Sequence, residues 1–134
     1  MRFTKNDSLD RWERPATLLG AKFRLSVLAE YPKEAIEEVA SAGLARLERA
    51  WLSIQQNVVA SLLSDYNESW ADPEAGLPVL QPEDFLSKLV LTAVDVLEEG
   101  DLSLYLSDSG LFGGHSVKAY VCGDGEILTP TLVG

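Results

Sequence analysis

Residues 32–63 read PKEAIEEVASAGLARLERAWLSIQQNVVASLL, the longest unbroken helical pattern in the chain. Apolar side chains recur there at steps of three and four residues, which is the pattern of one apolar stripe along an α-helix. The stripe consists of Ile36, Val39, Ala40, Leu44, Leu47, Trp51, Ile54, Val58 and Leu62. Pro32 suits the first helical turn, because that turn makes no use of its backbone N–H. At ~1.5 Å per residue, the pattern predicts a helix about 45 Å long.

Two residues of this helix carry specific expectations. Gly43 costs about 1 kcal/mol against alanine in a helix interior, so either another element packs closely there or the helix bends. Trp51 lies near the middle of the stripe and is expected to anchor the helix in the core. A single helix cannot bury its stripe alone, so the flanking segments are expected to form a sheet that receives it.

The segments before the helix predict β-strands. Residues 2–4 and 12–18 are candidates for two short strands near an edge of the sheet. In residues 21–28, apolar side chains alternate with the polar Lys22, Arg24 and Ser26. Such alternation predicts a half-buried strand with one basic side.

The segments after the helix are more varied. Residues 65–81 hold two prolines and a glycine without a sustained period, which predicts a long irregular connection. Residues 81–86 predict a short second helix with Pro82 near its start. Residues 89–94 are apolar on both faces, as in a central strand. Further strands with turn signals follow to the end, and together they predict an α+β fold: a mostly antiparallel sheet packed on one long amphipathic helix, in one domain over residues 1–134.

The charge of the chain is large and unevenly distributed. The formal net charge is −10, with +3 in residues 1–29 and −13 in residues 30–134. Most of such a surface repels nucleic acid and anionic membranes, so we expect neither as a partner. The first residues lack the apolar run of a secretory signal, and the single cysteine, Cys122, fits a reducing compartment. These features predict a cytoplasmic protein.

Residues that commonly carry chemistry are few. The chain has one histidine, His115, and one cysteine, Cys122, and their spacing matches no familiar metal site. No glycine-rich loop follows a strand and opens a helix, as a nucleotide-binding loop would. We therefore predict no catalytic residues, no metal and no cofactor.

The corner Leu111-Phe112-Gly113-Gly114-His115-Ser116-Val117 is the most distinctive short stretch. Its glycines permit positive φ angles or a close approach of the backbone. We expect Phe112 to point inward and His115 to cap carbonyls of the corner, which makes Phe112, Gly114 and His115 structural residues.

With these residues the chain resembles a family of small bacterial domains of unknown function. The family shares an early tryptophan, a long helix, a tryptophan in the following loop, a phenylalanine that opens the second half, and a Leu-Phe-x-Gly-His-x-(Ile/Val) corner. The matching features are Trp12, residues 32–63, Trp70, Phe85, residues 111–117, Gly125 and Gly134. Domains of this kind resemble immunity proteins that are encoded beside polymorphic toxins, so the resemblance implies such a role here.

Charge and resemblance together favour an immunity protein that occludes the basic active-site cleft of a cognate toxin acting on nucleic acid or nucleotides. Residues 65–84 hold six carboxylates and no lysine or arginine, and the segment around residue 100 offers a second acidic face. The predicted contact residues are Asp65, Tyr66, Glu68, Trp70, Asp72, Glu74, Glu83, Asp84, Glu98, Glu99 and Asp101.

Two alternatives stay open. One is a small hydrolase or toxin-reversing enzyme that uses His115 with a nearby carboxylate such as Asp108. The other is an adaptor domain without enzymatic activity.

Overall fold

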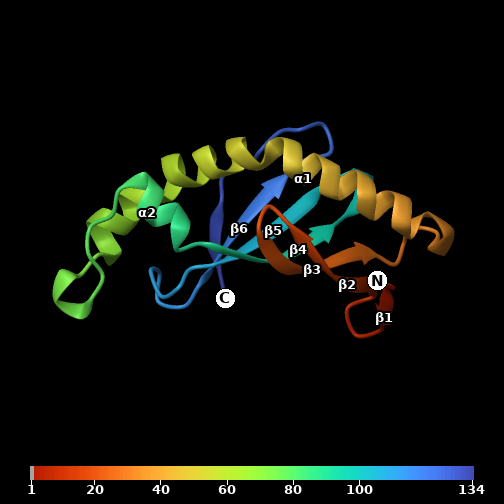
Figure 1. Ribbon diagram of the computed structural model, residues 1–134, viewed down its shortest axis with the longest axis horizontal. Helices are drawn as coiled ribbons and strands as arrows, with labels where there is room; N and C mark the ends of the chain where they lie inside the picture. The colour runs from red at the N-terminus through yellow and green to blue at the C-terminus, as the bar shows by residue number, and fades with distance from the viewer. Residues whose placement is uncertain (1) are drawn as a thin grey trace.

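The computed structural model describes residues 2–134, which form a seven-stranded sheet whose strand order follows the chain from β1 to β7. Every neighbouring pair is antiparallel except β3 and β4, which are parallel because a helical crossover joins them. The strands, most of them labelled in Figure 1, are β1 Thr4–Asn6, β2 Arg11–Leu18, β3 Ala21–Leu28, β4 Val90–Val96, β5 Leu102–Ser107, β6 Ser116–Val121 and β7 Thr131–Val133.

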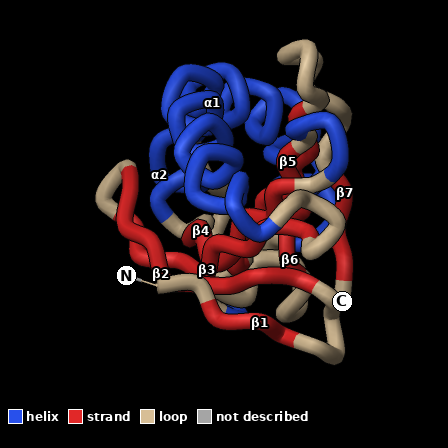
Figure 2. Tube along the Cα trace, turned by 90° about the vertical axis from the view of Figure 1, so that its right-hand side faces the viewer, coloured by secondary structure: helices blue, strands red, loops and turns tan. Residues whose placement is uncertain are grey.

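One long helical segment covers the sheet. It begins with a 3-10 turn at Lys33–Ala35, continues as α1 over Ile36–Val58, and ends in two π-helical stretches, Val59–Leu63 and Tyr66–Trp70. The short helix α2, Pro82–Ser87, lies beside its far end (Figure 1). Figure 2 shows α1 and α2 on the same side of the sheet. The predicted α+β fold, with a mostly antiparallel sheet, one long helix and a short second helix, is confirmed.

The core lies between α1 and the covered face of the sheet. Helix residues Ile36, Ala40, Leu47, Ile54 and Val58 are almost fully buried there. Trp51 is only partly buried, so the expectation that it anchors the core is wrong. At ~100° per residue, Trp51 lies about 40° around the helix from Leu47, and the indole therefore packs against the border of the core.

At Gly43, α1 packs closely against the sheet. A Cβ at this position would lie 2.9 Å from Cγ2 of Val96 in β4. Of the two explanations that the sequence left open, close packing against another element is the one that the structure bears out.

The predicted irregular connection after residue 63 is shorter than expected, because the helical segment continues to Trp70. The apolar spacing that begins at Ile54 recurs every four residues at Val58, Leu62, Tyr66 and Trp70, so the stripe extends past the predicted helix end. Beyond it lie a 3-10 turn at Pro73–Ala75 and an isolated bridge between Asp72 and Leu77. Among residues 2–134, no helix has the length and apolar character required to cross a membrane.

Candidate functional site

The six carboxylates between residues 65 and 84 gather at one end of the molecule, and we call them the acidic tip. All six side chains are exposed, and none forms an ion pair within residues 2–134. They come from the last turns of the long helix, the short loop after it and the first turn of α2, whose segments lie together at one end of Figure 1. The members are Asp65, Glu68, Asp72, Glu74, Glu83 and Asp84.

The two aromatic residues predicted to accompany these acids differ in exposure. Trp70 is 38% exposed and stands at the end of the long helix. Tyr66 is fully buried, so its predicted role as a partner anchor is wrong. Its hydroxyl donates a hydrogen bond of 2.8 Å to the carbonyl oxygen of Pro78, and burial raises the pKa of this phenol. The apolar stripe of the long helix continues in four-residue steps to Tyr66, and this spacing was the sequence signal that Tyr66 lies in the core.

Tyr66 belongs to an aromatic cluster that fixes the base of the acidic tip. Phe112 stands at its centre, with ring centroids 5.9 Å from Tyr66, 5.6 Å from Trp70 and 6.1 Å from Phe85. Phe112 and Phe85 are fully buried. The corner at residues 111–117 is therefore joined to the acidic tip through Phe112, which points inward as predicted.

The glycine corner is organised by Asp108, not by His115. The buried Asp108 carboxylate accepts backbone N–H bonds from Gly110 at 2.9 Å, Phe112 at 2.8 Å and Gly114 at 3.0 Å. Gly114 has a φ of +90°, which a residue with a Cβ adopts only under strain. Asp108 was predicted only as a possible partner of His115, although an aspartate before a glycine-rich turn commonly accepts such bonds.

His115 is half-buried, and its ring lies edge-on to Trp70 with centroids 6.4 Å apart. Because three N–H donors occupy the Asp108 carboxylate, this acid is poorly placed to serve His115 as a proton acceptor. The geometry of the corner is that of a structural turn beside the acidic tip.

The second predicted acidic face lies away from the acidic tip. Glu98, Glu99 and Asp101 occupy the turn between β4 and β5, where Gly100 packs against the guanidinium of Arg46 in α1. Arg46 and Asp65 are separated by roughly 28 Å of helix at ~1.5 Å per residue, so the two acidic regions are distinct surfaces.

Only part of this second face is free. Glu98 and Glu99 are exposed, and a hydrogen bond with Glu98, together with its charge, raises the pKa of the nearby Glu30. Asp101 is half-buried and accepts bonds from the Tyr120 hydroxyl at 2.8 Å and the Gly123 N–H at 2.6 Å. The bond to Asp101 is the main reason that the pKa of Tyr120 is raised to about 12. Asp101 therefore has a structural role in addition to any contact with a partner.

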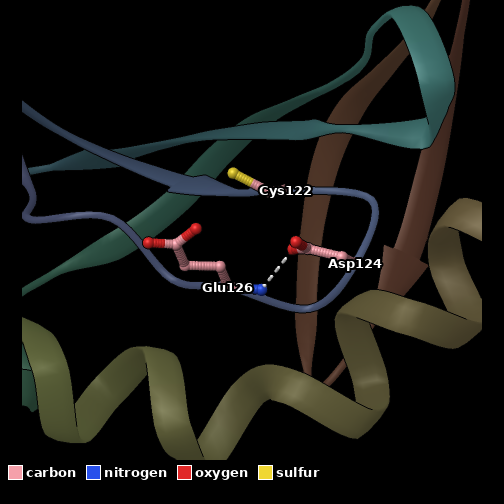
Figure 3. A group of neighbouring side chains, drawn as sticks. All are labelled: Cys122, Asp124 and Glu126. Atoms are coloured by element: carbon pink, nitrogen blue, oxygen red, sulfur yellow. Dashed lines mark hydrogen bonds between the residues drawn. The ribbon is translucent and has the colours of Figure 1, made fainter.

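A third group of side chains lies in the turn after β6. The ligand atoms of Cys122, Asp124 and Glu126 all lie within 4.8 Å of one another (Figure 3). The Asp124 carboxylate accepts the Glu126 N–H at 2.9 Å, and the two acids are exposed. Burial, followed by the charges of Asp101, Glu126 and Asp124, raises the pKa of the Cys122 thiol. This group is accounted for by the geometry of the hairpin turn.

The fold and these surfaces define a single-sheet α+β protein with one helix-covered face and an acidic tip. The chain belongs to the family DUF2262, described as an uncharacterized protein conserved in bacteria, whose model matches residues 2–131. No curated protein matches the chain, and no solved structure matches it.

Proposed function

We propose that this protein is a bacterial immunity protein that neutralises a cognate toxin by placing its acidic tip in a basic cleft of that toxin. The proposal rests chiefly on one observation: six carboxylates at one end of the molecule are exposed, and none has a cationic neighbour within ion-pair distance in the described residues 2–134. Such a surface attracts a cationic partner, accelerates the encounter and disfavours wrong partners.

The shape and order of the acidic tip support a protein contact. The aromatic cluster holds the end of the long helix, and Trp70 rests on Phe112 while 38% of it stays exposed. Tryptophan is strongly enriched among the residues that dominate protein–protein binding energies. A fixed tryptophan among exposed acids combines an apolar anchor with charge complementarity.

The acidic tip is a better contact surface than the turn that follows β4. Its members come from three neighbouring segments, whereas Asp101 is engaged by Tyr120 and Gly123. We therefore assign Glu98 and Glu99 a secondary role. A toxin that acts on nucleic acid or nucleotides fits this surface, because its active site must attract phosphates and a carboxylate-rich face competes for the same cationic groups. Action on such a toxin places the protein in the cytoplasm.

The test is neutralisation of the toxic product of the adjacent reading frame, measured by growth and by copurification. A triple variant, Asp65→Lys, Glu68→Lys and Asp72→Lys, is expected to weaken binding by at least about 100-fold, because three attractive charges become repulsive. The matched control reverses Glu34, Glu37 and Glu38, which are exposed at the other end of the helical segment.

The control should protect cells as the natural chain does. Full protection by the tip variant would reject the acidic tip as the contact. Turnover of a substrate by this chain alone, abolished by His115→Ala in a folded protein, would favour the enzyme alternative. Failure to bind or neutralise the adjacent product would favour an adaptor.

A further inference from the structure

A hollow lined mainly by cationic residues lies on the part of the sheet formed by the first strands, away from the acidic tip. It has a volume of about 450 Å³ and is formed mainly by β2 and β3, together with residues near β1 and at the start of β4. We call it the basic hollow, and its charged lining residues are Arg2, Glu13, Arg14, Lys22 and Arg24.

The charge of the basic hollow is opposite to that of the chain. Arg14 pairs with Leu25 of β3 and so directs its side chain toward the covered face, which leaves three cations, Arg2, Lys22 and Arg24, and one carboxylate in the hollow. The local net charge is +2 in a chain of net charge −10. Within residues 2–134, no carboxylate lies within ion-pair distance of Arg2, Arg14 or Lys22. Glu13, the one acid, accepts a hydrogen bond of 2.9 Å from the Asn6 amide. The positive charge is therefore largely uncompensated by the chain itself.

A buried carboxylate fixes one wall of the basic hollow. The Asp95 side chain is 6% exposed and lies 3.6 Å from Nη2 of Arg24 and 3.1 Å from Nη1 of Arg11. Ser26 donates a hydrogen bond of 2.5 Å to the same carboxylate. Because Asp95 is shared between two arginines, it orients the Arg24 guanidinium and leaves net positive charge on this face.

Arg14 is held in place by apolar and backbone contacts. Its Cζ lies 5.0 Å from the centroid of the Phe3 ring, and its Nη1 donates to the Pro15 carbonyl at 3.1 Å. Its Nε is buried and has no partner within residues 2–134. The guanidinium is thus ordered beside Phe3 on the side of the sheet that Leu25 faces, and the cations available to a ligand in the basic hollow are those of Arg2, Lys22 and Arg24.

We propose that the basic hollow binds a small organic anion that carries at least two negative charges on phosphate or carboxylate groups. The volume falls within the ~300–1,000 Å³ typical of small-molecule sites. Arginine forks match the oxygens of phosphate and carboxylate, and Thr4 and Thr92 add hydroxyls to the lining.

The occupant is a small molecule, because the charge around the hollow disfavours a polymer. A long polyanion would extend over the acidic remainder of the surface and be repelled. At physiological ionic strength the Debye length is about 8 Å, so a ligand confined to the hollow interacts mainly with the local cations.

The test is calorimetric titration of the full chain with three probes: pyrophosphate, citrate and acetate. Pyrophosphate should bind at least about tenfold more tightly than acetate, since it can engage several cations at once. Equal affinity for citrate would assign a general oxyanion site, and a preference for pyrophosphate would assign a phosphate-bearing ligand.

Two variants locate the site. Lys22→Gln and Arg24→Gln should each weaken pyrophosphate binding about five- to tenfold, because each removes one charge-assisted contact. Lys22 is exposed and is not part of the Asp95 cluster, so its replacement should leave thermal unfolding unchanged. Arg49→Gln on the exposed surface of α1 is the matched control and should change affinity less than about twofold.

Two results would overturn the proposal: equal binding of pyrophosphate and acetate by the natural chain, or equal losses in the Arg49 control and the hollow variants. The measurement needs no toxin, so its outcome is independent of the proposed immunity role.

Discussion

The two faces of the sheet bury their residues by different means. On the face that α1 covers, the strands contribute aliphatic side chains such as Leu25, Val94 and Leu104, all fully buried. On the uncovered face, the same three strands bury the polar residues Ser26, Asp95 and Ser103, with Ala93 as a small apolar neighbour. The covered face is stabilised by the apolar area removed from water, whereas the uncovered face depends on pairing between charged and polar groups.

The covered face therefore serves the stability of the fold, whereas the uncovered face keeps charged groups that a ligand can contact. A packed aliphatic face has no chemistry to offer a ligand, and changes there act through cavities and strain. The uncovered face keeps Arg24 and Lys22 exposed above a buried acid, which leaves charge available to a ligand. The acidic tip belongs to neither face of the sheet and lies where the long helical segment ends.

The largest expected effect is on the covered side. Phe112→Ala should lower the free energy of unfolding by about 3–5 kcal/mol, because Phe112 is fully buried and joins three other aromatic rings. Denaturant unfolding measures the change. Leu52→Ala, at a position 67% exposed on α1, is the control and should alter stability by no more than about 0.5 kcal/mol. A loss under about 1 kcal/mol for Phe112→Ala would mean that the cluster is not a packed core.

A smaller loss is expected on the uncovered face. Asp95→Asn removes the charge that Arg11 and Arg24 share, and it should cost about 2 kcal/mol. The cost stays below that of a fully buried pair, because side-chain exposures of 21% and 44% let water reach the two arginines. Unfolding at low and high salt measures it, with Glu13→Gln as the control on the same face. Unchanged stability would show that the uncovered face does not depend on this pairing.

Sequence patterns identified the covered face well. The alternation in residues 21–28 predicted which side chains of β3 face the helix, and the 3.6-residue period predicted the long helix. Both patterns repeat a local geometry, so local sequence suffices to read them. The prediction failed at the helix end, where serine, aspartate and asparagine around Tyr66 obscured an apolar spacing that in fact continued.

The functional surfaces were harder to predict from the sequence. The acids at residues 65–84 could be found by composition, but the burial of Tyr66 depends on Phe85 and Phe112, which are distant in sequence. The basic hollow combines residues 2, 22 and 24 through strand pairing, and Asp95 contacts Arg24 from a strand that follows the whole helix. A single sequence gives no register for such a parallel pair, because its strands are joined by a long crossover.

A substitution at Gly43 tests how closely α1 packs against the sheet. Gly43→Ala gains about 1 kcal/mol of helix propensity but places a Cβ 2.9 Å from Val96, a stiff side chain on a central strand. Overpacking of this kind costs about 1–3 kcal/mol, so a net loss of about 1 kcal/mol is expected. Ala45→Gly, at an exposed site of α1, calibrates the propensity term alone. Stabilisation by Gly43→Ala would mean that the helix can move away from β4 at little cost.

The smallest effect is a pH dependence on the uncovered face. The hydrogen bond to Asp101 raises the pKa of Tyr120 from 10.0 to about 12 in the folded chain. A raised folded pKa stabilises the fold below the unfolded pKa, so this contribution should be complete below pH 10 and disappear as the pH rises toward about 12. Absorbance titration of tyrosinate should show one late-ionising group that Tyr120→Phe removes and that Asp101→Asn shifts to lower pH. An unaltered titration curve in Tyr120→Phe would show that the late ionisation belongs to another residue, for which the buried Tyr66 is the first candidate.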